Sequence, residues 1–163
     1  MEIVEASEKD IPVIHELAEK IWRPTYRPIL SEEQINYMLE NMYSENALKE
    51  QMRGDIKFIL VKRDNETVAF AGYSIEYGSD PVFNIHKIYV LPSEQGKGTG
   101  KNLIEYLSNL AKDLNIPQVE LNVNRANPAL GFYQKMGFQI LESVDIPYHK
   151  FVLNDYVMGK EVF

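Results

Sequence analysis

The sequence contains no cysteine among its 163 residues. This absence excludes a disulfide framework, a thiolate metal site and a cysteine nucleophile. The chain also lacks the run of about 20 apolar residues that a membrane-spanning helix needs, so we expect no membrane partner. The opening Met1–Ser7 has neither the basic flank nor the apolar stretch of a secretory signal. We therefore expect a cytoplasmic protein.

Basic residues are in the minority, because 17 Lys and Arg stand against 24 Asp and Glu, for a formal net charge of -7. This balance argues against binding DNA or RNA over a broad surface. An acidic surface would suit a cationic small substrate, although an acidic excess also serves solubility alone. The three histidines, His15, His86 and His149, form no ligand-spaced pair, so we expect no metal site.

With 45% hydrophobic residues and no repeat or linker, the chain is expected to form one domain over residues 1–163. Apolar periodicity and turn residues predict the elements in order. They are a strand at 3–4, helices at 11–21, 31–42 and 44–54, strands at 56–61, 68–77 and 82–90, a helix at 103–114, a strand at 119–123, a helix at 127–136, and strands at 138–144 and 151–158. This order predicts a mixed α/β sheet with helices on both faces.

Local signals mark several helix boundaries. Ser-x-x-Asp and Ser-x-x-Gln patterns predict capping boxes at Ser7 and Ser31. Pro24 and Pro28 predict that the first helix is interrupted after Trp22.

The strand at 82–90 shows one irregularity. Phe83 and Ile85 share one parity, whereas Ile88 and Val90 share the other. A β-bulge between the two pairs would absorb the extra residue and leave backbone groups unpaired. If instead both faces of the strand are buried, the parity carries no information.

A glycine-rich segment joins this strand to the next helix, and it reads Gln95-Gly96-Lys97-Gly98-Thr99-Gly100-Lys101. Alternating glycines let the backbone turn tightly and aim several N–H groups at one anion. The positive helix end and a lysine at 97 or 101 would add favourable charge. The segment is thus a candidate phosphate cradle, with a plain strand-to-helix turn as the alternative.

The residue spacing of this segment does not match either of two common nucleotide-binding motifs. A Walker A loop needs glycine five residues before Gly100, where Gln95 stands. It also needs Ser or Thr after Lys101, where Asn102 stands. A Rossmann fingerprint needs G-x-G-x-x-G, whereas these glycines are evenly spaced.

The segment instead resembles motif A of the GNAT acetyltransferases, Gln/Arg-x-x-Gly-x-Gly/Ala, matched by Gln95, Gly98 and Gly100. The resemblance implies the GNAT acyl-CoA N-acyltransferase fold: α/β, a mixed, mostly antiparallel sheet of about seven strands with a splayed, bulged central strand and helices on both faces. It implies that the loop's backbone N–H groups hold the pyrophosphate of coenzyme A. It also implies that the strand pairs through its backbone with the pantetheine arm, at Ile88, Tyr89 and Val90.

Downstream, a strand leads into the string Asn124-Arg125-Ala126-Asn127-Pro128-Ala129-Leu130-Gly131-Phe132-Tyr133-Gln134-Lys135-Met136-Gly137-Phe138. Locally this is a strand, a capped short helix and a glycine stop. As a whole it resembles the family's second block, which implies that Tyr133 lies near the coenzyme sulfur. The family's asparagine most often stands seven residues before the tyrosine, at Ala126 here, so Asn127 and Asn124 both stay candidates for coenzyme contact, together with Lys135.

The implied chemistry needs an acid and a base. An alkylamine has a pKa near ~10.4, so it must lose a proton before it attacks the thioester, while the departing thiolate needs a donor, for which we expect Tyr133. Many family members place glutamate eleven residues before the motif glutamine, where Asn84 stands, and some use a later position, here Asn122. His86, with a reference pKa near ~6.5, is the candidate base. Glu76 and water stay open, as does a histidine with no chemical role.

Acceptor specificity in the family comes from the region after the first helix and from the last strands. Aromatic residues there line an acceptor pocket or simply build the core, namely Trp22, Tyr26, Tyr37, Tyr73, Tyr148 and Tyr156. The stretches 21–26 and 154–158 resemble the PaiA-type subgroup, some of which acetylate polyamines.

We therefore expect an enzyme that moves acetyl from acetyl-CoA to a primary amine, such as a polyamine, by direct attack in a ternary complex without metal. A protein or peptide acceptor is one alternative. A GNAT fold that senses acyl-CoA without turnover is another, because Asn84 occupies the usual base position. The resemblance also makes a homodimer possible, by analogy alone.

Overall fold

The computed structural model describes all 163 residues and contains seven strands and five α-helices. The strands are β1 (Glu2–Glu5), β2 (Lys57–Arg63), β3 (Glu66–Glu76), β4 (Val82–Val90), β5 (Gln118–Asn124), β6 (Gln139–Tyr148) and β7 (Phe151–Glu161). The α-helices are α1 (Ile11–Tyr26), α2 (Glu32–Tyr43), α3 (Glu45–Arg53), α4 (Thr99–Asp113) and α5 (Ala129–Lys135). Two 3₁₀ turns, η1 (Glu8–Asp10) and η2 (Pro92–Glu94), precede α1 and the glycine loop.

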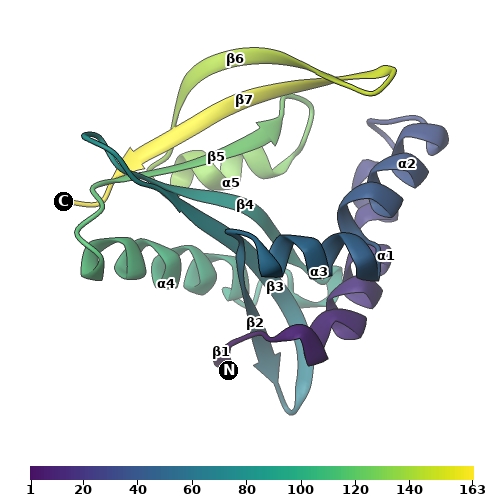
Figure 1. The fold of residues 1–163 in the computed structure, drawn as a ribbon, viewed down its shortest axis with the longest axis horizontal. Helices are drawn as coiled ribbons and strands as arrows, with labels where there is room; N and C mark the ends of the chain where they lie inside the picture. The colour runs from purple at the N-terminus through teal and green to yellow at the C-terminus, as the bar shows by residue number, and fades with distance from the viewer. The chain divides into compact units, whose positions relative to one another are not determined.

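The strands are hydrogen-bonded in the order β1-β2-β3-β4-β5-β7-β6, a mixed seven-stranded sheet that confirms the predicted α/β class (Figure 1). The chain forms two compact units, of which the first comprises residues 1–74 and 87–103 and the second residues 75–86 and 104–163. β3, β4 and α4 each run from one unit into the other. The single domain over 1–163 stays a prediction. No helix has the length and apolarity that crossing a membrane would require.

The first unit has a core built on β2 and β3, which pair antiparallel with Leu60 opposite Phe70. Both strands are buried on both faces over most of their length, in keeping with their near-continuous apolar sequences. Helix α1 buries the apolar stripe that its 3.6-residue period predicts, including Ile14, Leu17 and Ala18.

The helix starts follow the predicted caps, with one shift. The Ser31 hydroxyl accepts the N–H of Gln34 at 3.1 Å and caps α2, whereas the Gln34 side chain donates to Met38 Sδ at 3.7 Å, so only the serine half of the predicted capping box is seen. The N–H of Ser7 donates to the Asp10 carboxylate at 2.9 Å, but this box opens η1, and α1 follows it. The interruption predicted after Trp22 is wrong, because α1 continues through Pro24 to Tyr26. A proline in the last turn forfeits one backbone hydrogen bond, and the chain ends the helix just before Pro28 instead.

The second unit is organised around β5. The first half of β4 pairs with β5 in parallel, with Ile85 opposite Leu121, and β7 pairs with β5 antiparallel, with Met158 opposite Leu121. The β6–β7 hairpin extends this sheet (Figure 1). Alternation is regular along β5, where Val119, Leu121 and Val123 are buried, so the opposite face carries the polar residues of the strand.

Burial along β4 does not follow its apolar parity. Phe83, Ile85 and Lys87 are the buried positions, so a lysine stands where the sequence pattern suggested a change of face. The apolar pattern predicted the wrong facing for this part of β4, because a pattern of apolar residues does not include a buried lysine. The bulge expected in this strand stays a prediction, whereas the placement of Asn84 and His86 on the face opposite Phe83 and Ile85 agrees with the alternation.

Candidate active site

The glycine loop lies in the first unit, between β4 and α4. Gly96 and Gly98 have φ values of +80° and +77°, in the left-handed region that L side chains rarely adopt. A Cβ at either position would meet nothing within 4 Å, so the backbone there is open to close approach. Gly100 lies inside α4 at negative φ. The glycine requirement at 96 and 98 is therefore conformational.

Helix α4 begins at the end of this loop with Thr99. The first N–H groups of an α-helix lack intrahelical acceptors and carry the positive end of the helix dipole. In α4 these groups belong to Thr99, Gly100 and Lys101, and the N–H of Asn102 then donates to the Gly98 carbonyl at 3.0 Å. Loop and helix start together form a backbone arrangement suited to a phosphate.

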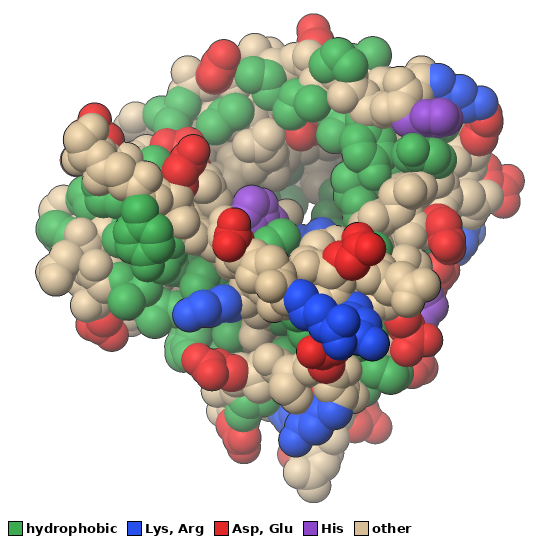
Figure 2. All heavy atoms as spheres, in the orientation of Figure 1, with side chains coloured by type: hydrophobic (Ala, Val, Ile, Leu, Met, Phe, Trp, Pro, Cys, Tyr) green, Lys and Arg blue, Asp and Glu red, His purple; other side chains and the backbone are tan.

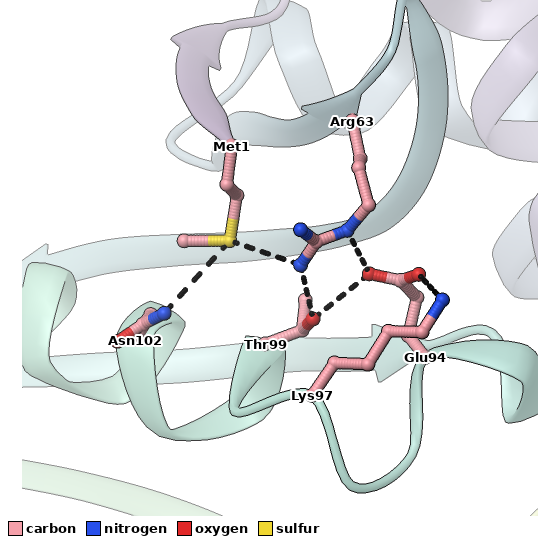
Figure 3. A network of polar contacts seen from close by, with 6 residues as sticks. All are labelled: Met1, Arg63, Glu94, Lys97, Thr99 and Asn102. Atoms are coloured by element: carbon pink, nitrogen blue, oxygen red, sulfur yellow. Dashed lines mark hydrogen bonds and ion pairs between the residues drawn. The ribbon is translucent and has the colours of Figure 1, made fainter.

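A buried carboxylate braces the loop from behind (Figure 3). Glu94 is only 4% exposed, and its Oε1 accepts hydrogen bonds from Arg63 Nε and from Thr99 Oγ1, each at 2.9 Å. Lys97 Nζ lies 3.3 Å from Oε2. The hydrogen bond from Arg63 is the main cause that lowers the pKa of Glu94. Sequence reasoning missed this network, because no spacing rule links Arg63 on β2 to a glutamate beside a glycine loop.

Two lysines of the loop were predicted to assist an anion. The ammonium of Lys97 already pairs with Glu94, although its side chain is 53% exposed. Lys101 is exposed on the first turn of α4. The roles of both lysines stay predictions, as does the backbone pairing expected at residues 88–90.

An aromatic cluster surrounds the end of β4 in the first unit. The Tyr89 ring packs against Trp22, Tyr43 and Phe70, with ring centroids 5.8–6.1 Å apart. Its hydroxyl lies 3.2 Å from that of Tyr26. Burial raises the pKa of both Tyr43 and Tyr89. Of the six aromatic acceptor candidates, three are buried, and for these the core interpretation is favoured: Trp22, Tyr26 and Tyr73.

Lys87 enters this cluster from β4. Its Nζ lies 4.4 Å from the centroid of the Tyr43 ring, a cation–π contact, and the residue is 8% exposed. Burial lowers the pKa of Lys87 to about 8. Sequence analysis missed this residue too. A lysine in a strand is ordinarily expected to face solvent, and the change in apolar pattern between Ile85 and Ile88 did not indicate that Lys87 is buried.

The second motif lies in the second unit. Tyr133 is buried in α5 and packs edge-on against Phe138, with centroids 6.0 Å apart. Asn127 Oδ1 accepts the N–H of Ala129 at 2.9 Å just ahead of α5, but the N-cap of this helix is Pro128 and not Asn127 as predicted. Asn124 Oδ1 accepts the N–H of Ala126 at 2.9 Å.

Each of these residues thus has a local structural role, to which the predicted coenzyme contacts would be added. Lys135 is exposed in the last turn of α5.

A carboxylate stands beside each of the two asparagines, Asn84 and Asn122, that occupy positions where the resemblance implies a glutamate in some members. Asn84 Nδ2 donates to Glu76 Oε2 at 3.4 Å, between β4 and β3. Asn122 on β5 forms a side-chain hydrogen bond with Asp155 on β7. Burial raises the pKa of Asp155, although this hydrogen bond opposes the shift. His86 is exposed on the same face of β4 as Asn84.

Arg125 fixes the β6–β7 hairpin at the end of β5. Its Nη2 pairs with the Asp145 carboxylate at 2.6 Å. Its Nη1 donates to the carbonyls of Val144 at 2.9 Å and Asp155 at 3.2 Å, and to the Ser143 hydroxyl at 3.0 Å. These contacts fix the backbone of both hairpin strands, and they engage the Nη1 and Nη2 hydrogen-bond donors of the guanidinium.

The structure therefore divides the predicted site residues between the two units. The first holds the loop residues 95–101 and the strand residues 88–90, and the second holds His86, Tyr133 and the three further coenzyme candidates, Asn124, Asn127 and Lys135.

A strand, a glycine loop and a following helix, on a mixed α/β sheet, are the features that the resemblance to the GNAT acetyltransferases implies. Residues 13–138 match the model of the acetyltransferase (GNAT) family. The chain belongs to this family, is PaiA-like within it, and is an acyltransferase.

Two comparisons give similar proteins from the same organism. The chain is 28% identical over 146 residues to the spermidine N(1)-acetyltransferase of Thermoplasma acidophilum, covering 86% of this chain and 89% of that protein. The crystal structure of the PaiA N-acetyltransferase from Thermoplasma acidophilum in complex with coenzyme A superposes with a TM-score of 0.83 at 28% identity, covering 98% of each chain. A peptidyl-lysine N-acetyltransferase of Salmonella typhimurium is 41% identical over 54 residues, covering 32% of this chain and 34% of that protein.

Proposed function

We propose that this protein transfers acetyl from acetyl-CoA to a primary amine of a small molecule such as a polyamine, by direct attack in a ternary complex. The observation that carries the proposal is the glycine loop. Two left-handed glycines with open space beside them precede the start of α4, and Glu94 braces the loop from behind. This arrangement fits the pyrophosphate of coenzyme A, which the PaiA relative holds in its crystal structure.

Each predicted site residue has a place in this proposal. Backbone N–H groups of residues 95–101 bind the pyrophosphate, and the backbone of residues 88–90 pairs with the pantetheine arm. Asn124, Asn127 and Lys135 add polar contacts to the coenzyme. The coenzyme supplies the thioester that is attacked.

The chemistry balances as follows. The acceptor ammonium loses a proton, its nitrogen forms a bond to the thioester carbonyl carbon, and the carbon–sulfur bond breaks. Tyr133 gives its phenolic proton to the departing sulfur and regains one from the nitrogen or from water. His86 is the proposed base, with Glu76 or a water as the alternative. The sum is an N-acetylamine, free coenzyme A and one released proton.

A polyamine acceptor is supported by the spermidine N(1)-acetyltransferase relative and by the net charge of -7. Acidic side chains lie dispersed over the visible face of the molecule (Figure 2). The similarity to a peptidyl-lysine acetyltransferase extends over a third of the chain, so a peptide acceptor is the second candidate.

The first test is release of free thiol from acetyl-CoA in the presence of spermidine, spermine, amino acids, aminoglycosides and short peptides. We expect release with the polyamines. Release with peptides alone would move the acceptor to the second candidate. Silence with every amine, while coenzyme A still raises the melting temperature, would favour a sensor without turnover and overturn the proposal.

Tyr133→Phe tests the acid. Removing the phenolic proton should lower kcat by about 10²–10⁴-fold, the range of general acid–base catalysis, while coenzyme A affinity stays within about twofold. Tyr106→Phe, on α4, is the matched control and should retain full turnover. An unchanged kcat for Tyr133→Phe would remove this residue from the mechanism.

A further inference from the structure

Asp155 is a partly buried carboxylate that forms no ion pair. It lies on β7 opposite Asn124 of β5, and the side chain of Asn122 hydrogen-bonds to it. Arg125 is close enough to act on it electrostatically, yet the guanidinium forms its ion pair with Asp145 and reaches only the backbone carbonyl of Asp155. The positive charge beside Asp155 is thus engaged elsewhere.

Two other carboxylates of the second unit differ from Asp155 in this respect. The Asp145 side chain is 65% exposed and already paired with Arg125. Glu76 is exposed and accepts a hydrogen bond from Asn84. Water screens exposed charges, whereas a carboxylate that has lost part of its hydration gains more from an arriving cation. Among the three, Asp155 therefore has the most to gain from a cationic ligand.

Asp155 also lies on the polar face of the second unit's sheet. Along β5 the buried Leu121 and Val123 alternate with Asn122 and Asn124, and the antiparallel register places Asp155 beside these asparagines. Directly paired residues point to the same face of a sheet, so the Asp155 carboxylate lies on the same face as Asn122 and Asn124. Asn122 occupies the position where the resemblance implies a glutamate in some family members. In this chain the carboxylate therefore lies on β7, one strand away from the position on β5 where the resemblance implies a glutamate.

We propose that Asp155 binds an ammonium group of the acceptor that is not acetylated, and that it sets a preference for amines with a second cationic centre. The inference rests on the proposed function and names a specificity residue for it. A carboxylate stabilises the ammonium form of a nearby amine and so opposes its deprotonation. Asp155 therefore suits a spectator ammonium rather than the attacking nitrogen, whose proton goes to a separate base.

Asp155→Asn tests the inference with a near-isosteric loss of charge. We expect KM for spermidine to rise about tenfold, with kcat within about twofold, because a partly desolvated charge contact lies between exposed and fully buried pairs in strength. KM for n-propylamine, which has one amine only, should change less than twofold. Asp155→Glu keeps the charge and should retain most of the preference.

Glu161→Gln is the matched control, since it removes one negative charge from an exposed position on the same strand and leaves the ion pair of Arg125 with Asp145 intact. An equal rise in KM for both Glu161→Gln and Asp155→Asn would overturn the inference, because the effect would then be one of overall charge. Equal changes for spermidine and n-propylamine would overturn it as well. Asp155→Ser replaces Asp155→Asn if the latter does not fold, as judged by its melting temperature.

A calorimetric titration of spermidine into the protein with coenzyme A present needs no turnover. The Kd should rise about tenfold in Asp155→Asn. This readout separates the two proposals, because absence of thiol release with every amine counts against the proposed function. An unchanged spermidine Kd counts against the role of Asp155 alone.

Discussion

At the scale of single residues, Lys87 is the clearest departure from ordinary burial. Its side chain is almost wholly enclosed, its ammonium rests on the Tyr43 ring, and no carboxylate pairs with it. Burying a charge without a counter-charge costs free energy, and a cation–π contact returns only about 0.5–2 kcal/mol of it. Burial lowers the pKa of Lys87 from 10.5 to about 8, so the charged form is held at a cost.

Replacing Lys87 by Met should therefore stabilise the fold by about 1–3 kcal/mol at pH 7. The pKa of Lys87 is lower in the folded than in the unfolded chain, so the cost of the charge is complete below pH 8. It fades as the pH rises from about 8 to 10.5, where the unfolded chain binds the extra proton. The advantage of Lys87→Met should shrink over that interval, as measured by urea unfolding at several pH values.

Lys57→Met, at an exposed position on β2, is the matched control for this measurement. It should change the free energy of unfolding by no more than about 0.5 kcal/mol. If Lys87→Met proved less stable than the natural protein at every pH, packing of the lysine stem and its ring contact would outweigh the cost of burying its charge.

At the scale of elements, the unit that matters is β4, the glycine loop and α4. The glycines give the loop its path, but nothing in that path by itself holds it in one conformation. Glu94 does so, because one carboxylate oxygen joins Arg63 on β2 to the Thr99 hydroxyl at the start of α4. The helix start is thereby tied to the sheet through a buried polar contact.

Glu94→Gln should loosen this bracing and weaken coenzyme A binding by about tenfold, since a neutral amide loses the charge-assisted bond with Arg63. The pKa of Glu94 is lower in the folded chain than its ordinary value of 4.5. Its contribution to stability is therefore present above about pH 4.5 and is lost as the pH falls below that value. The difference in melting temperature between the natural protein and Glu94→Gln should be constant above pH 5 and narrow in acid.

Coenzyme A titration by calorimetry checks the first part of this prediction, with Glu66→Gln, an exposed position at the start of β3, as control. An unchanged coenzyme A Kd for Glu94→Gln would show that the glycines and the helix start hold the loop without the carboxylate.

At the scale of the whole molecule, continuous elements connect the two compact units. β3, β4 and α4 each contribute residues to both, so neither unit can lose these elements without affecting the other. We therefore expect the chain to unfold as one domain in a single transition, as the length of 163 residues also predicts.

Equilibrium urea unfolding tests this expectation with two probes. Fluorescence of Trp22, the only tryptophan, reports on the first unit, whereas far-ultraviolet circular dichroism reports on both. Coincident midpoints are expected. Two separated midpoints would show that the units unfold independently.

The sequence alone determined the element order, the α/β class and the family. The glycine loop and the capping positions are local features, because a left-handed glycine or a serine at a helix start acts on its immediate neighbours. Two predictions from local sequence, about α1 and β4, were wrong. The helix α1 continues through Pro24, because the free-energy cost of this proline is tolerated in the last turn, and the facing of β4 differs because Lys87 is buried.

Only the tertiary structure decided which charges the fold buries and with what partners. Arg63 donates a hydrogen bond to Glu94, 31 residues later in the chain. Lys87 contacts the ring of Tyr43 at the end of α2, and Asp155 on β7 is hydrogen-bonded to Asn122 on the neighbouring strand β5. None of these pairs has a characteristic spacing, because strand pairing and helix packing bring them together after the chain has folded. The tight turn of the glycine loop could therefore be predicted from the sequence, but the groups that brace the loop and the carboxylate proposed to select the acceptor could not.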